Sequence, residues 1–290
     1  MNVLKNEFIT AKINPKGAEL SSVVLDGIER MWQADPKIWG RHSPLLFPFV
    51  GRLMNQQYEL DDAVIHAPTH GFCRDRVFDV VACSDTKVRY RTESDRGTID
   101  VYPFPFTLEV EFELVGKSII KRHFVTNRGQ REMPFEVGGH DAYRTTLFPG
   151  ENMSDYAIAF EGVTELHPYA MDEKGMLGLP EMTVTLEDGL LTQLPEQLGL
   201  DTVVLSDLPV RKAALVSKKS RVRVMVEFED FPYLGIWTAQ KGVETHYICI
   251  EPWSTLPDGY FAGRKLTDKK GICLLAPGET KSLCYTTTFA

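Results

Sequence analysis

The chain has 290 residues, of which 43% are hydrophobic and 25% are charged, a balance typical of globular proteins and not of disordered ones. Its formal net charge is −8, and it has no basic stripe of the kind that binds nucleic acid. No apolar run reaches the ~18 residues that a membrane-spanning helix needs. The N-terminus also lacks the apolar core of a signal peptide, so we expect a cytoplasmic protein with no membrane partner.

Hydrophobic and polar residues alternate along much of the chain, which is typical of strands that bury one face. Near the middle of the chain, for example, Phe106, Leu108 and Val110 alternate with Thr107 and Glu109. In chain order, this pattern predicts strands at residues 8–13, 20–25, 77–82, 87–92, 106–114, 119–126, 156–160, 183–186, 222–228, 247–251 and 283–289.

Tight-turn signals such as Asp26-Gly27 separate the predicted strands. Helix signals are few: Asp35-Pro36 predicts the start of a short helix, and residues 190–198 predict one or two helical turns. Many short strands joined by tight turns favour an all-β fold in which large antiparallel sheets pack face to face. Because no linker interrupts this pattern, we expect a single domain over residues 1–290.

The cysteines argue against a disulfide framework and against a structural zinc site. Their number is odd, and no two of them form a C-x-x-C pair. They are Cys73, Cys83, Cys249, Cys273 and Cys284. We therefore interpret them as buried free thiols.

Four titratable residues stand in unusual local settings. His70 precedes a glycine in the string Thr-His-Gly-Phe, and His140 follows two glycines, which permit close approach of a backbone or a ligand. Arg52 follows a proline-bounded apolar run. Glu251 ends the apolar run Tyr-Ile-Cys-Ile, where partial desolvation would raise its pKa toward the value that a general base needs. Each residue taken alone is also compatible with a surface or satisfied core position.

Several well-known catalytic motifs are absent from the sequence. It contains no phosphate-binding G-x-x-x-x-G-K-[ST] loop, no dinucleotide-binding G-x-G-x-x-G after a strand, no H-E-x-x-H and no G-x-S-x-G. His66 and His70 have the i, i+4 spacing of a helical metal pair, but Pro68 lies between them. We therefore expect neither a cofactor nor a metal ion.

Five segments together resemble the aldose 1-epimerase (galactose mutarotase) family, most closely its LacX-like branch. The segments are residues 44–53 (PLLFPFVGRL), 70–75 (HGFCRD), 138–143 (GGHDAY), 231–238 (FPYLGIWT) and 250–253 (IEPW). Their order and spacing agree with the family over nearly the whole chain. The resemblance implies a galactose mutarotase-like β-supersandwich with few short helices, no cofactor, and a sugar or sugar phosphate as substrate, in a protein that is a monomer or a homodimer.

The resemblance also implies roles for individual residues. His140 corresponds to the family's general acid and Glu251 to its general base. His70 corresponds to a histidine that hydrogen-bonds the sugar near its ring oxygen, and Arg52 to the substrate-binding arginine. Asp201 is the best match to an aspartate that binds sugar hydroxyls.

Three positions bear on which sugar is bound. The chain has Gly51-Arg52 where galactose mutarotases have Asn-Arg, and Asp201-Thr202 where they have Asp-His. Arg74 is similar to arginines that hold phosphate in the related hexose-6-phosphate mutarotases, or it forms a surface ion pair. Trp237 is either a core residue or an apolar face for a sugar ring.

Two other functions remain open at this point. A non-catalytic carbohydrate-binding or sugar-sensing protein would use the same cleft. A glycoside hydrolase or lyase would need two carboxylates that flank the scissile bond, and Glu251 with Asp201 would be that pair. The two histidines favour an isomerase that exchanges the α and β anomers of an aldose or aldose phosphate.

Overall fold

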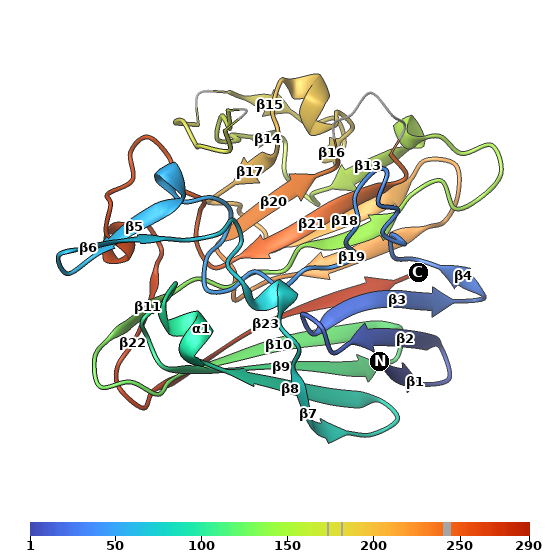
Figure 1. Ribbon diagram of the computed structural model, residues 1–290. Helices are drawn as coiled ribbons and strands as arrows, with labels where there is room; N and C mark the ends of the chain where they lie inside the picture. The colour runs from blue at the N-terminus through green and yellow to red at the C-terminus, as the bar shows by residue number, and fades with distance from the viewer. Residues whose placement is uncertain (173, 181, 240–244) are drawn as a thin grey trace.

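A computed structural model describes residues 1–172, 174–180, 182–239 and 245–290 (Figure 1). Among these residues the single α-helix is one turn, α1 (Arg96–Ile99). The five 3-10 turns are η1 (Met54–Gln56), η2 (Cys73–Asp75), η3 (Met153–Asp155), η4 (Pro195–Leu198) and η5 (Leu266–Asp268). None of the described helices has the length and apolar character to cross a membrane. The prediction of an all-β fold is confirmed.

The largest sheet has nine antiparallel strands, and their order interleaves distant parts of the chain. From one edge to the other the strands are β16 (Leu190–Leu191), β13 (Tyr156–Ala159), β18 (Lys212–Ser217), β19 (Arg223–Glu227), β23 (Thr280–Phe289), β10 (Ser118–Asn127), β9 (Phe106–Val115), β8 (Lys87–Glu93) and β7 (Asp79–Cys83). The C-terminal strand β23 joins the two halves, because it pairs with β19 and with β10.

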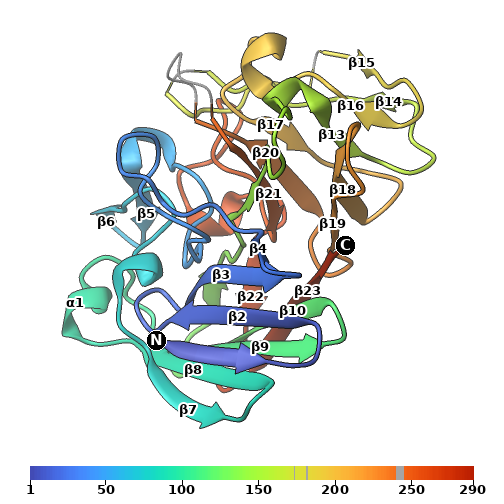
Figure 2. The same ribbon diagram turned by 90° about the vertical axis from the view of Figure 1, so that its right-hand side faces the viewer.

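Two four-stranded sheets accompany the large one. One has the order β1 (Asn2–Lys5), β2 (Ile9–Asn14), β3 (Glu19–Leu25) and β4 (Ile28–Glu29). The other has the order β12 (Asp141–Arg144), β21 (Tyr247–Trp253), β20 (Tyr233–Trp237) and β17 (Val203–Leu205). In both views the first sheet lies near β8–β10 and the second near β18 and β19 (Figures 1 and 2). One large hydrophobic cluster joins side chains from all three sheets.

Three two-stranded ribbons lie at the periphery of these sheets. They are β5 (Gln57–Leu60) with β6 (Ala63–His66), β11 (Met133–Phe135) with β22 (Cys273–Leu275), and β14 (Glu165–Leu166) with β15 (Val184–Thr185). The prediction of one domain over residues 1–290 remains a prediction.

Each predicted strand overlaps an observed one, with shifts of a few residues at the ends. The predictions missed β12, β17 and β20, which are three of the four strands in the sheet that contains Glu251. The sequence of β20, YLGIW, does not alternate because nearly all of its residues are buried, so both faces are covered. Burial on both faces therefore removed the alternation that would have identified β20.

The two helix predictions are corrected by the structure. Asp35 begins only one hydrogen-bonded turn, in which its carbonyl accepts from the backbone N–H of Trp39 at 2.8 Å. The turn stops there because the Trp39 side chain packs against other aromatic rings, and Gly40 follows. Residues 190–198 form the short strand β16 and then η4, which begins at Pro195, a residue suited to a first helical position.

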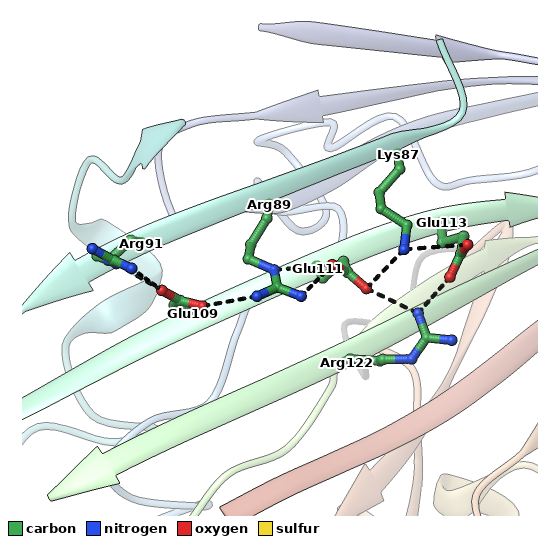
Figure 3. A network of polar contacts seen from close by, with 7 residues as sticks. All are labelled: Lys87, Arg89, Arg91, Glu109, Glu111, Glu113 and Arg122. Carbon is green, nitrogen blue, oxygen red and sulfur yellow. Dashed lines mark hydrogen bonds and ion pairs between the residues drawn. The ribbon is translucent and has the colours of Figure 1, made fainter. Parts of the chain in front are cut away.

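The outer face of β8, β9 and β10 carries a ladder of alternating charges (Figure 3). Glu111 lies at its centre with a side chain only 5% exposed. It accepts from Arg89 at 2.9 and 2.6 Å, from Arg122 at 3.0 Å and from Lys87 at 3.4 Å. Because every partner comes from a neighbouring strand, the ladder ties β9 to both β8 and β10.

We expect Glu111→Ala to lower the free energy of unfolding by roughly 1–3 kcal/mol, because it leaves three neighbouring cations without their shared acceptor. Glu113→Ala is the matched control, since Glu113 is 27% exposed and also pairs with Lys87 and Arg122. We expect it to cost at most about 1 kcal/mol. Urea unfolding of both variants measures the difference, and equal losses would contradict a special role for the buried carboxylate.

Candidate active site

A cavity of about 250 Å³ opens on the sheet that contains Glu251. It brings together every residue that the sequence analysis selected as a site residue. These residues are Arg52, His70, Arg74, His140, Asp201, Trp237 and Glu251. They come from positions far apart in the chain, so the sheet and the loops around it create the cluster.

Strand β21 supplies the floor of the cavity because its side chains alternate between two faces. Ile248 and Ile250 belong to the main hydrophobic core, so Cys249 and Glu251 point to the opposite face. In the pairing of β20 with β21, Gly235 lies opposite Glu251. Because glycine has no side chain, it does not cover the carboxylate. The end of an otherwise apolar strand thus delivers one carboxylate to the cavity.

Glu251 and His140 form the closest titratable pair in the cavity. The Nε2 atom of His140 lies 3.4 Å from Oε1 of Glu251, and both side chains are at least nine-tenths buried. His140 immediately precedes β12, which pairs with β21, and this pairing sets the two side chains next to each other. An imidazole nitrogen and a carboxylate oxygen thus lie side by side at the cavity.

Aromatic packing fixes the ring of His140. The Trp39 ring stacks on it with 5.0 Å between centroids, and the Trp237 ring meets it edge-on at 5.5 Å. Tyr247 in turn stacks against Trp39 at 5.6 Å. In this packing Nε2 of His140 faces the carboxylate. Trp237 borders the cavity and is partly exposed, so it is not a simple core residue.

His70 lies in a tight turn that explains the glycine after it. His70 has φ +62° and Gly71 has φ +69°. A Cβ atom added to Gly71 would lie 2.1 Å from the carbonyl oxygen of Phe47, so any other residue here would clash with the backbone. The turn places the His70 ring 5.5 Å from that of His140, measured between centroids.

The backbone around His70 also determines its tautomer. The N–H of Gly51 donates to Nδ1 of His70 at 3.1 Å, and the N–H of His70 donates to the carbonyl of Gly51 at 2.8 Å. Because Nδ1 accepts a hydrogen bond, the neutral ring carries its proton on Nε2. His70 therefore presents a hydrogen-bond donor on the ring atom that is not bound to the backbone.

Burial shifts the titration of the catalytic candidates in opposite directions. Desolvation raises the pKa of Glu251 well above its usual range; the Trp253 indole opposes this shift and the charges of Asp141 and Asp201 add to it. Desolvation lowers the pKa of His140 to about 3, and the positive charge of Arg74 contributes. The pair therefore holds one proton and no net charge over a wide pH range.

His70 is kept neutral by the same causes. Desolvation lowers its pKa well below the usual 6.5, and the positive charges of Arg74, Arg41 and Arg52 contribute in the same direction. Perturbed values of this kind gather at functional sites. The cavity therefore contains two neutral histidines and is bordered by positively charged arginines.

Arg52 and Arg74 border the cavity, and Arg41 lies beside Arg74; we call these three the rim arginines. Arg52 donates to the carbonyl of Lys174 at 2.8 Å and borders the cavity. Arg74 borders it too, and its Nε lies 3.7 Å from the carboxylate of Asp75. Arg41 shares that carboxylate at 3.1 Å. The single carboxylate of Asp75 thus neutralises only one of the two arginines, Arg41 and Arg74. Arg74 therefore adds positive charge beside the cavity and does not simply form a surface ion pair.

Asp201 borders the cavity on the side of β17. Its carboxylate accepts a hydrogen bond from the Thr202 hydroxyl at 3.1 Å. Its negative charge is one of the causes that raise the pKa of Glu251. The geometry is compatible with a group that binds sugar hydroxyls, and that role remains a prediction.

Among the described residues, one group of side chains offers the ligand types that hold a metal ion. His140, Cys249 and Glu251 each supply one donor atom, and these atoms lie within 4.8 Å of one another. Cys249 does not border the cavity, and burial raises its pKa well above the usual range, whereas a metal binds the thiolate. The prediction that the site uses no metal remains a prediction.

Sequence reasoning missed several residues at the site. Trp39 and Trp253 border the cavity, and Arg41 lies beside Arg74 at the shared carboxylate of Asp75. Trp39 was interpreted as part of a helix, although a tryptophan in a polar, proline-containing turn is a signal for a surface contact. Arg41 gave no signal, because its relation to Arg74 depends on a shared aspartate that only the fold brings between them.

Known proteins share sequence and fold with this chain. The sequence profile of the aldose 1-epimerase family matches residues 1–272. Protein LacX (chromosomal) of Lactococcus lactis subsp. lactis is 32% identical, and the match covers 98% of each chain. A galactose mutarotase related enzyme of Lactobacillus acidophilus has a TM-score of 0.93 at 29% identity, covering 100% of this chain and 97% of its own. A galactose mutarotase-like protein of Lactobacillus casei has a TM-score of 0.91 at 28% identity, covering 100% of both chains.

Proposed function

Since this chain belongs to the aldose 1-epimerase family, we propose that it is an isomerase that exchanges the α and β anomers of an aldose or aldose phosphate. The observation that carries the proposal is the buried Glu251–His140 pair, which faces a cavity together with His70. Anomer exchange opens a cyclic hemiacetal, turns the exposed aldehyde and closes the ring again. Opening requires one proton acceptor at the anomeric hydroxyl and one proton donor at the ring oxygen.

The pair contains one acceptor and one donor because it holds a single proton. In the empty protein the opposite pKa shifts place this proton on Glu251. Once it has moved to Nε2 of His140, Glu251 takes the proton of the anomeric hydroxyl while His140 donates to the ring oxygen. The C–O bond of the ring breaks as the carbonyl forms, so charges and atoms balance. Closure on the other face of the aldehyde reverses both transfers and restores the pair. General acid–base assistance of this kind is typically worth ~10²–10⁴ in rate.

The remaining side chains position the sugar. His70 donates from Nε2 to an oxygen near the ring oxygen, and Arg52 and Asp201 bind hydroxyl groups. Trp237 offers its ring edge and face to the apolar side of the sugar. Fixed positioning of the reacting atoms lowers the barrier further, because the entropy of orientation is lost on binding and not in the chemical step.

The rim arginines favour a substrate with a negative charge. Arg41 and Arg74 share one aspartate, so the pair carries an excess positive charge that a phosphate group would neutralise. A free sugar offers no such group. We therefore expect a sugar phosphate to have the lower KM of the two substrate types.

The pH dependence of exchange follows from the opposite pKa shifts. Below about 3, His140 gains a proton and the pair no longer contains a base. Above the raised pKa of Glu251, the pair loses its last proton and no acid remains. An uncharged aldose must be the substrate in this test, because the phosphate group of a sugar phosphate itself titrates at about pH 6. With that substrate we expect kcat/KM to be flat around pH 6.5, where an unshifted histidine titrates. A fall in kcat/KM with an apparent pKa near 6.5 would contradict the assignment.

NMR exchange between α and β anomers tests the proposal directly. Purified protein is added to a panel of aldoses and their 6-phosphates, and the exchange rate is compared with the uncatalysed rate. We expect acceleration for at least one sugar. Binding without acceleration would identify a sugar-sensing protein, and release of reducing sugar from a glycoside would identify a hydrolase that uses Glu251 and Asp201.

A further inference from the structure

A buried cluster of three titratable groups lies beside the active site but outside its cavity. Lys269 follows η5, Glu136 follows β11, and Asp258 lies in the loop after β21. The Nζ atom of Lys269 lies 2.7 Å from Oε1 of Glu136 and 3.0 Å from Oδ1 of Asp258. All three side chains are more than nine-tenths buried. Burying ions is costly even when they are paired, so stability alone does not explain the cluster.

Each carboxylate uses its second oxygen on the backbone of one short segment. Oε2 of Glu136 accepts from the N–H of Val50 at 2.7 Å, and Oδ2 of Asp258 accepts from the N–H of Met54 at 2.8 Å. The N–H of Asp258 also donates to the carbonyl of Arg52 at 3.0 Å. Lys269 joins the two carboxylates, so both ends of the segment from Val50 to Met54 are held by one cation.

The middle of this segment contacts the site. Gly51 exchanges two hydrogen bonds with His70, and one of them fixes the His70 tautomer. Gly51 also lies directly against Pro257, the neighbour of Asp258: an added Cβ would be 2.5 Å from the proline ring. Arg52, the next residue, borders the cavity. Gly51 and Arg52 lie outside the strands, so individual backbone and side-chain contacts hold the segment.

We propose that Lys269, Glu136 and Asp258 are positioning residues that set Arg52 and the His70 tautomer for the reaction. None of the three borders the cavity, so they act only through the segment from Val50 to Met54. The kinetic part of this inference rests on the proposed function. The tautomer part does not, because it concerns the hydrogen bond between Gly51 and His70 in the protein without substrate.

Lys269→Met tests the proposal, since methionine has a similar length and carries no charge. We expect the ¹⁵N resonances of His70 to move from the pure Nε2–H tautomer toward a mixture, because Gly51 no longer holds Nδ1. We also expect kcat/KM for anomer exchange to fall by about 10–100-fold, as displacement of a positioning group does. Asp258→Asn is the second variant, which keeps the shape of the side chain and one acceptor. It should change both quantities in the same direction by less.

Glu111→Ala is the matched control, because it removes a buried carboxylate from the charge ladder on β9, away from the cavity (Figure 3). It should leave the His70 resonances and kcat/KM unchanged although it lowers stability. If a folded Lys269 or Asp258 variant loses stability but keeps wild-type His70 resonances and kcat/KM, the cluster is only structural and the proposal is wrong. If the wild-type protein accelerates no sugar, the proposed function fails, and the His70 resonances alone decide this inference.

Discussion

Glu251→Gln is expected to slow anomer exchange by about 10²–10⁴-fold while sugar binding is retained. Glutamine has the shape of glutamate and can still accept a hydrogen bond, but its amide cannot take the proton of the anomeric hydroxyl. Because Glu251 is buried and its raised pKa already favours the uncharged form, an uncharged amide should not disturb the fold. NMR exchange measures the rate, and calorimetric titration measures sugar binding.

Glu161→Gln is the matched control for this variant, since Glu161 is an exposed glutamate that does not border the cavity. It should exchange anomers at the wild-type rate. Near-normal exchange by the Glu251 variant would refute the base assignment. Loss of sugar binding together with loss of exchange would show instead that Glu251 holds the substrate and does not act as the base.

His140→Gln is expected to slow anomer exchange by a similar factor, because the reaction then lacks the group that donates a proton to the ring oxygen. The glutamine side chain has nearly the volume of histidine and can donate a hydrogen bond without giving up a proton. The double variant with Glu251→Gln is the informative measurement. Residues that act as one unit have non-additive effects, so the double variant should be little slower than the slower single variant.

If the fold-reduction in exchange rate of the double variant equals the product of the two single reductions, the two groups act independently. That result would contradict the one-proton pair. Sugar affinity and thermal unfolding of all three variants serve as controls for damage to the cavity. The stacked ring of Trp39 lies against His140, so a change in tryptophan fluorescence would report such damage.

Two residues of the site, Glu251 and His70, could be predicted from their neighbours in the sequence. Glu251 was selected because a carboxylate closed an apolar strand, and the alternation of β21 explains why it points away from Ile250 and the core. His70 was selected for the glycine after it, and the backbone of Phe47 explains why that glycine is needed. The sequence signals for both residues are local: each consists of neighbouring residues in one strand or one turn.

Other parts of the site had no local signal. Arg41 joins the rim only because Asp75 lies between it and Arg74. Lys269 reads as an ordinary surface lysine in the sequence, yet it is buried against Glu136 and Asp258. Strands β12, β17 and β20 were missed because packing on both faces removes the alternation that identifies a strand.

The all-β class, most of the long strands, the family resemblance and the seven candidate residues could be read from the amino-acid sequence. The folded chain was needed to show that those residues share one cavity, that Nε2 of His140 faces Glu251, and that His70 carries its proton on Nε2. The physical reason is that strand patterning follows from neighbours along the chain. Desolvation, ion pairing and tautomer choice follow from neighbours in space, which the pairing of distant strands creates.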